Sequence, residues 1–161
     1  LRSGAGLVGV ATRAAHVPAM LARRPEVMAQ GVDGAATLRP LIDRAGIVAI
    51  GPGLGQAAWG SALFGVALAS GKPLVVDADG LNLLAKGGQA LPSDAILTPH
   101  PGEAARLLQT DAAAVQADRL GAARRLCKAF GCVEGTGGAD RDRTGSLRAP
   151  AHGEHGNERS Q

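Results

Sequence analysis

The chain has 161 residues, of which 45% are hydrophobic and 19% charged, and its formal net charge is +3 at pH 7. The charges are scattered without a run of like sign, and only Trp59, Phe64 and Phe130 are aromatic, which argues against a nucleic-acid-binding surface. No apolar run reaches the length of a membrane span and no signal peptide is apparent, so we expect one globular domain in the cytoplasm.

The N-terminal part of the chain predicts short strands and helices in alternation. Residues 1–3 resemble the end of a helix that Gly4 and Gly6 stop, so we expect the domain to start upstream of Leu1. Strands are predicted over residues 7–12 and 25–30. Helices are predicted over residues 18–24 and 37–44, the second with Thr37 as its cap.

Residues 46–130 continue this alternation with stronger signals. Strands are predicted over residues 46–50, 72–77 and 94–98, and the first two are apolar enough for burial on both faces. Helices are predicted over residues 56–70, 81–85, 102–109 and 111–130, the last with Leu120, Leu126 and Phe130 facing inward. Strands separated by helices predict an α/β fold with three layers, αβα, around a mostly parallel sheet. Cys127 and Cys132 fit neither a metal site nor a disulfide framework and are expected to be reduced.

A glycine-rich loop follows the first of these strands, with Gly51, Gly53 and Gly55. Glycines let the backbone approach a ligand closely, and the N–H groups of a helix start attract an anion. The spacing matches neither a Walker loop nor a dinucleotide-binding fingerprint. Taken alone, the loop is therefore either a phosphate-binding loop or a tight turn.

An acidic turn follows the second strand, with Asp77, Asp79 and Asn82. Two carboxylates and an amide at a strand end can hold Mg²⁺ through water or bind a polar ligand. The alternative is purely local, with Asp79 capping the next helix and Asn82 bonded to the backbone.

A histidine between two prolines follows the third strand. Pro99 and Pro101 each restrict φ to about −65°, so His100 is expected at the rim of the sheet. Pro101 then starts a helix with Glu103 in its first turn. The alternative is a proline-rich turn with an incidental histidine.

The three turns are expected to share one location, because the carboxyl ends of neighbouring parallel strands lie along one edge of a sheet. A single crevice would then hold an anion-accepting loop, a carboxylate pair and an imidazole. The sequence has no Gly-x-Ser-x-Gly motif, which argues against a hydrolase of that type.

Residues 50–55 (IGPGLG), 76–82 (VDADGLN) and 97–103 (LTPHPGE) together resemble the ADP/ATP-dependent NAD(P)H-hydrate dehydratases, a carbohydrate-kinase-related family with a ribokinase-like fold. The similarity implies an incomplete domain of this fold over residues 1–132. It implies that (S)-NADHX or (S)-NADPHX, the S epimers of hydrated NADH and NADPH, are dehydrated to NADH or NADPH. ADP or ATP, with Mg²⁺, would convert the ring hydroxyl into a phosphate leaving group.

The resemblance also assigns roles to residues of the three turns. Gly55 and His100 would line the hydrated-nucleotide site, and Gly51 and Gly53 would shape the loop. The remaining polar residues would support the phosphates and the metal: Asp79, Asn82 and Glu103. No residue is assigned as a direct metal ligand.

Residues 133–161 depart from the family pattern. They have no apolar periodicity and are predicted to be a disordered tail. The family continues with an apolar strand, a nucleotide-binding turn and a glycine-rich loop that ends in the catalytic Asp. Gly138, Ala139 and Asp140 match only the letters of that loop, without a supporting strand or helix. We therefore expect the nucleotide half-site and the catalytic Asp to be missing, and dehydratase activity to be negligible.

Two other functions stay open at this point. One is a related small-molecule kinase, for a vitamin or a sugar, which phosphorylates without elimination. The other is a nucleotide-binding module without catalysis that uses the loop from Gly51 to Gly55. The sequence also leaves open the choice between ADP and ATP, an epimerase domain upstream of residue 1, and the oligomeric state, a homo-oligomer included.

Overall fold

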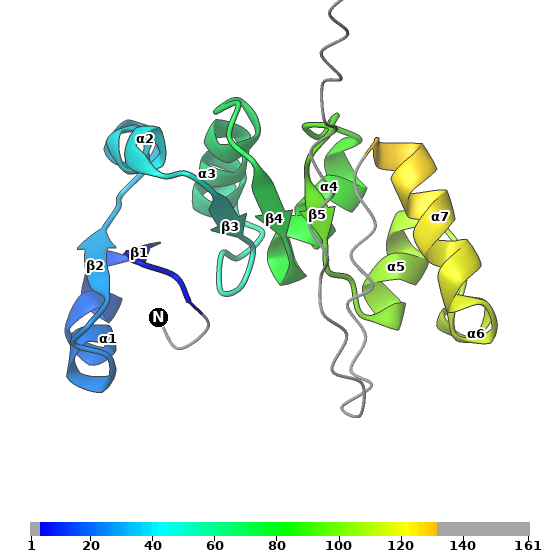
Figure 1. Cartoon of the computed structure of the whole chain (residues 1–161), viewed down its shortest axis with the longest axis horizontal. Coiled ribbons are helices and arrows are strands. Elements are labelled where there is room, and N and C mark those ends of the chain that lie inside the picture. The colour runs from blue at the N-terminus through cyan, green and yellow to red at the C-terminus, as the bar shows by residue number, and fades with distance from the viewer. Residues whose placement is uncertain (1–3, 132–161) are drawn as a thin grey trace, which may run out of the picture.

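The computed structural model describes residues 4–131, and strands and helices alternate along them as predicted (Figure 1). The strands are β1 (Gly9–Thr12), β2 (Met28–Gly31), β3 (Val48–Ile50), β4 (Leu74–Val76) and β5 (Ile96–Leu97). The helices are α1 (Val17–Arg23), α2 (Ala35–Arg44), α3 (Ala58–Leu68), α4 (Ala78–Gly87), α5 (Pro101–Leu107), α6 (Ala112–Ala117) and α7 (Arg119–Phe130), and a short 3₁₀ helix, η1 (Ala14–His16), precedes α1.

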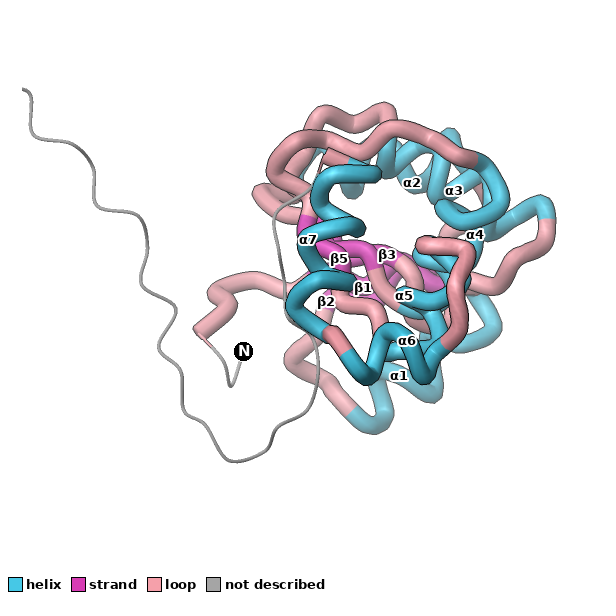
Figure 2. The backbone as a smooth tube through the Cα atoms, turned by 90° about the vertical axis from the view of Figure 1, so that its right-hand side faces the viewer, coloured by secondary structure: helices cyan, strands magenta, loops and turns pink. Residues whose placement is uncertain are grey.

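All strand pairs of the described residues are parallel, as predicted, but they form two sheets. β1 pairs with β2, and β3, β4 and β5 lie side by side in that order. The register of the larger sheet aligns Ile50 with Val76 and Val76 with Leu97. In both views α2 and α3 lie above the row of strands and α1 lies below it (Figures 1 and 2). Because the three strands are aligned and parallel, the turns that follow them leave the sheet at the same edge.

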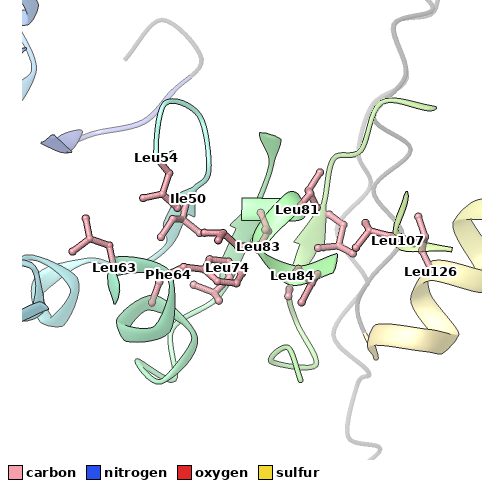
Figure 3. Close-up of a cluster of buried hydrophobic side chains, with 14 of the residues drawn as sticks. Ile50, Leu54, Leu63, Phe64, Leu74, Leu81, Leu83, Leu84, Leu107 and Leu126 are labelled. Atoms are coloured by element: carbon pink, nitrogen blue, oxygen red, sulfur yellow. The ribbon is translucent and has the colours of Figure 1, made fainter. Parts of the chain in front are cut away.

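The hydrophobic core lies against one face of the three-stranded sheet. Side chains alternate between the two faces of a strand, and the aligned residues Ile50, Val76 and Leu97 are all buried. They belong to one apolar cluster to which α3, α4, α5 and α7 also contribute (Figure 3). Its helical members include Leu63, Phe64, Leu81, Leu84, Leu107 and Leu126. This packing makes the larger sheet a rigid base for the turns at its edge.

The opposite face of this sheet is less covered than the sequence predicts. Ile47 is 68% exposed and Ile96 is 38% exposed, and Ala49, which aligns with Ile96 through Val75, is exposed as well. The prediction that residues 46–50 are buried on both faces is therefore wrong for the described chain. An apolar run shows that side chains favour burial, but burial also needs an element packed over them.

Two helix predictions are wrong because aspartates cap the helices at other places. Asp118 interrupts the helix predicted over residues 111–130: its carboxylate accepts a hydrogen bond from the Gly121 N–H at 2.8 Å and starts α7. The break changes the face that α7 presents, and Leu120, predicted to point inward, is 60% exposed. Asp77 caps α4, which therefore begins at Ala78 rather than at residue 81.

The start of α2 also differs in detail. Its cap is Gly34, and Thr37 lies in the first turn, where its hydroxyl oxygen accepts from the N–H groups of Asp33 and Gly34. Among residues 4–131 no helix has the length and apolar character needed to cross a membrane. The predicted tail, with Gly138, Ala139 and Asp140, lies outside the described residues, and so does Cys132.

Candidate functional site

The three turns predicted to carry the chemistry lie at one edge of the three-stranded sheet. They comprise residues 51–57 after β3, residues 77–82 at the end of β4 and the start of α4, and residues 98–103 at the end of β5 and the start of α5. We call this the carboxyl edge, because the parallel strands end there. Ligands of open α/β sheets bind at such an edge.

Close packing requires a glycine at the start of the loop after β3. Gly51 has φ +137°, and a Cβ placed on it would lie 1.7 Å from the backbone oxygen of Asp77. The next residues turn back, with the Leu54 N–H donating to the Gly51 oxygen at 3.0 Å and the Leu54 side chain buried. Gly51 therefore joins the loop to the turn after β4.

The other two glycines of the loop face open space. Gly53 and Gly55 have φ values of +69° and +73°, where a side chain is strained. A Cβ at either position would meet no atom within 4 Å. On this side the loop exposes bare backbone, as the approach of a ligand requires.

The two carboxylates of the acidic turn have different partners. One oxygen of Asp77, Oδ1, accepts from the Ala78 N–H at 2.9 Å, and Ala78 adopts a left-handed φ of +46°. Asp79 reaches across to the glycine loop: its Oδ2 accepts from the Gly55 N–H at 2.9 Å and its Oδ1 from Gln56 Nε2 at 3.1 Å. The local alternative, in which Asp79 only caps the next helix, is wrong, because Asp77 is the cap.

Hydrogen bonds to the charged form lower the pKa of Asp79 below its ordinary value. The largest cause is the backbone N–H of Gly55, followed by the side chain of Gln56, while burial acts weakly in the opposite direction. Asn82 contributes a further hydrogen bond that lowers this pKa. Asp79 is therefore an ionised acceptor that holds the loop.

No local sequence motif predicts three further polar residues of this region, which are Gln56, Lys86 and Arg106. Gln56 Oε1 accepts from Lys86 Nζ at 2.7 Å, so the Gln56 amide lies between Lys86 and Asp79. On the same face of α4, Asn82 Oδ1 accepts from Arg106 Nη1 of α5. These contacts join residues 24 or 30 positions apart, and only the fold brings them together.

His100 and Glu103 form a reciprocal cap at the start of α5. His100 Nδ1 accepts from the Gly102 N–H at 3.0 Å, with a longer contact of 3.4 Å to the Glu103 N–H. Glu103 Oε2 accepts from the His100 N–H at 2.9 Å, and Glu103 Oε1 lies 3.3 Å from His100 Nε2. Because Nδ1 accepts, the proton of the neutral ring is on Nε2, which points to Glu103.

The same cap positions the imidazole at the surface. The side chain of His100 is 65% exposed, whereas that of Glu103 is 8% exposed. Pro101 begins α5 and Glu103 lies in its first turn, as the sequence predicts. Gly102 was not singled out from the sequence, yet a Cβ there would lie 2.9 Å from His100 Cε1. Its lack of a side chain is what allows the ring to fold over the helix start.

The predicted site residues therefore fall into two groups. Gly51, Gly55, Asp79 and Asn82 belong to one packed and hydrogen-bonded unit, with Gly53 in the same loop. His100 and Glu103 form the second unit, and α5 connects it to the first through Arg106. Within residues 4–131 no group of three or more His, Cys, Asp and Glu side chains is arranged to hold a metal ion.

Most of the chain is similar to known proteins. The carbohydrate-kinase family model described as NAD(P)H-hydrate dehydratase matches residues 1–135. The bifunctional NAD(P)H-hydrate repair enzyme Nnr of Coxiella burnetii is 50% identical over 125 residues, which are 78% of this chain and 25% of that enzyme. The ADP-dependent (S)-NAD(P)H-hydrate dehydratase of Neisseria meningitidis is 39% identical over 120 residues, 71% of this chain and 40% of that enzyme.

Solved structures agree with these matches. A ribokinase-like superfamily protein from Enterococcus faecalis superposes with a TM-score of 0.71 at 29% identity, covering 81% of this chain and 46% of that chain. The ADP/ATP-dependent NAD(P)H-hydrate dehydratase of Bacillus subtilis, co-crystallized with ATP/Mg²⁺, superposes with a TM-score of 0.64 at 26% identity. The superposed region covers 80% of this chain and 46% of the Bacillus subtilis chain. This chain thus spans a quarter to two fifths of those two curated relatives and about half of these solved structures.

Proposed function

Because this chain belongs to the NAD(P)H-hydrate dehydratase family and has its ribokinase-like α/β fold, we propose that its carboxyl edge binds the hydrated nicotinamide dinucleotide. The ligand would be (S)-NADHX or (S)-NADPHX. The reaction to which this half of the domain contributes is the ADP- or ATP-dependent dehydration of that ligand to NADH or NADPH. The proposal includes the cytoplasmic location that the sequence predicts.

One observation carries this proposal: the open backbone of the glycine loop, after β3, and the exposed imidazole, after β5, lie at the same edge of one parallel sheet, with β4 between their strands. Gly53 and Gly55 leave room for a ligand to touch the loop, and the ring of His100 is mostly exposed. In the proposed roles, Gly55 and His100 contact the ligand and Gly51 fixes the loop. Asp79, Asn82 and Glu103 act behind them, since their oxygens are bonded to other residues of the site.

For the complete domain of this family we propose ADP or ATP with Mg²⁺ as the co-substrate, because the related Bacillus subtilis dehydratase was co-crystallized with ATP/Mg²⁺. Mg²⁺ in nucleotide sites usually keeps several waters and binds one or two carboxylates plus phosphate oxygens. Asp77 fits that requirement, because its Oδ2 accepts no hydrogen bond from another described residue. The bound nucleotide would supply the phosphoryl group that turns the ring hydroxyl into a leaving group.

This chain is proposed to bind the hydrated dinucleotide without turning it over. The family's catalytic Asp and nucleotide turn are predicted to be missing from residues 133–161, and this prediction lies outside the described residues. Phosphoryl transfer is catalysed by positioning the reactants and stabilising charge. A site without the catalytic Asp and the nucleotide turn therefore loses most of its catalytic rate.

Isothermal calorimetry of the 161-residue chain with (S)-NADPHX, NADPH and ADP tests the binding. We expect saturable binding of (S)-NADPHX, weakened by His100→Ala, and no saturable binding of ADP. The Ala substitution at His16, an exposed histidine outside the carboxyl edge, is the matched control. Absence of (S)-NADPHX binding would overturn the proposal, and normal turnover of (S)-NADPHX with ADP would overturn its second part.

A further inference from the structure

Both carboxylate oxygens of Asp79 accept hydrogen bonds from the glycine loop after β3. Its Oδ2 accepts from the backbone of Gly55 and its Oδ1 from the side chain of Gln56, at 2.9 Å and 3.1 Å. Both partners follow β3, whereas Asp79 lies in the first turn of α4, which follows β4. One side chain thus fixes the relative position of two of the three turns at the carboxyl edge.

The part of the loop that Asp79 holds has little other support. The start of the loop is held by the close approach of Gly51 to Asp77 and by the buried side chain of Leu54. Beyond Leu54, the residues Gly55 and Gln56 are exposed, and glycine loses the most conformational entropy when it is ordered. The Gly55 oxygen rests against Gly60 of α3, and the Gly55 N–H is held by Asp79.

Gln56 makes this arrangement specific for a carboxylate at position 79. Its Nε2 donates to Asp79 and its Oε1 accepts from Lys86 at 2.7 Å. An ammonium group has only donors, so Lys86 keeps the Gln56 amide from turning over. The group at position 79 must therefore accept two hydrogen bonds, one from Gly55 and one from Gln56.

The same helix turn is tied to α5. Asn82 lies one turn after Asp79, interacts with it, and accepts a hydrogen bond from Arg106. Arg106 belongs to the last turn of α5, the helix that His100 caps. Through Asp79 and Asn82, α4 contacts both Gly55 and α5, and it therefore connects the glycine loop to the helix that the imidazole caps.

We propose that Asp79 is a positioning residue, which holds Gly55 and Gln56 in the single loop conformation that presents the open side of the loop to the hydrated dinucleotide. The ligand in this statement rests on the proposed function, whereas the holding of the loop does not. Asp79 acts through the loop and has no catalytic role.

The test uses the full chain and the variant Asp79→Asn. Asparagine keeps one acceptor but turns an NH₂ toward either Gly55 or Gln56, so one of the two hydrogen bonds is lost. Amide hydrogen exchange followed by NMR is expected to show faster exchange at Gly55, with unchanged exchange at Leu84 in the core of α4. Asp43→Asn is the matched control, because Asp43 is exposed and its carboxylate has no described partner.

A rescue experiment separates this mechanism from a general loss of stability. Lys86→Met removes the ammonium that orients Gln56, so the Gln56 amide can turn over and accept from the asparagine introduced by Asp79→Asn. The double variant Asp79→Asn/Lys86→Met is expected to regain part of the slow exchange at Gly55. No regain, or equal acceleration at Gly55 and Leu84 in the single variant, would overturn the proposal.

Binding supplies the second readout. Loss of one hydrogen bond to a charged group is expected to weaken (S)-NADPHX binding about tenfold in Asp79→Asn. Asp43→Asn is expected to bind as the unmodified chain does. Faster exchange at Gly55 with undiminished affinity for (S)-NADPHX would mean that ligand binding does not need the loop conformation held by Asp79. That result would overturn the part of the proposal that concerns the ligand. If the unmodified chain does not bind (S)-NADPHX, the proposed function fails, and exchange at Gly55 still decides whether Asp79 holds the loop.

Discussion

The two sheets of this chain use the same parallel pairing, yet they differ in how their residues are covered. Leu74 and Val76 of the three-stranded sheet are 1% and 0% exposed, and the helices after its strands carry most of the core. In contrast, no residue of β1, β2 or α1 is buried. The predicted site residues all belong to the well-packed region.

This difference indicates what each region contributes. A loop with three left-handed glycines needs a rigid base, which the buried sheet and α4 provide. The N-terminal region is attached through α2, which contacts both β1 and α3, and through Arg13 and Val32. Trp59 Nε1 donates to the Val32 oxygen at 3.1 Å, and the Arg13 guanidinium lies 4.2 Å from the centre of the Trp59 ring. We therefore expect substitutions to have unequal effects in the two regions.

The largest difference is expected between two glycines. Gly51→Ala would place a methyl group on the backbone oxygen of Asp77 and strain φ, so it should lower the free energy of unfolding by about 4 kcal/mol or more. Gly9→Ala in β1 would bring a methyl group near only the Met28 oxygen, at 4.0 Å. It should change the free energy of unfolding by less than about 0.5 kcal/mol. Urea unfolding followed by circular dichroism measures both. Equal losses would show that the two regions are held equally tightly.

Core truncation is expected to rank next. Phe64 is 2% exposed, so Phe64→Ala should cost about 3–5 kcal/mol through lost burial and a cavity. Met28 of β2 is 57% exposed, and Met28→Ala should cost less than about 0.5 kcal/mol. The same denaturation experiment applies, and a large loss for Met28→Ala would mean that β2 is covered in solution.

A smaller effect is expected at the contact between the regions. Trp59→Phe keeps a ring but removes the hydrogen bond to Val32 and weakens the cation–π contact with Arg13, a loss of about 1–2 kcal/mol. Hydrogen exchange should accelerate in β1 and β2 and stay unchanged in β4. Uniform acceleration in all three strands would contradict the view that Trp59 mainly attaches the N-terminal region.

The smallest effect concerns the pH dependence that Asp79 confers. Its pKa is lowered in the folded chain, chiefly by the Gly55 N–H, so the folded state favours its ionised form. This contribution is present above the ordinary Asp pKa of about 4 and is lost as the pH falls through the lower folded value. The stability difference between the chain and Asp79→Asn should therefore shrink below about pH 4. Asp43→Asn in α2 is the control, and a difference that grows toward acid would contradict the assignment.

Much of the fold and of the site could be predicted from local patterns. The order of strands and helices, their parallel arrangement and the positions of the three turns follow from apolar runs bounded by Gly, Pro and Asp. The start of α5 at Pro101 is an example, because the fixed φ of proline suits the first turn of a helix. The family could also be identified, since its motifs are local strings of residues.

Contacts between distant segments could not be predicted in this way. The hydrogen bonds of Asp79 with Gly55, of Lys86 with Gln56 and of Arg106 with Asn82 join residues 24 to 30 positions apart. Contacts over such separations produce no periodic pattern in the sequence. The exposure of Ile47 was missed for the same reason, because burial depends on which element packs over a residue. Local chemistry by itself determined where this chain turns and which residues stand at the turns. Only the tertiary structure decided which of them touch, because those contacts arise when packed strands and helices bring distant residues within hydrogen-bonding range.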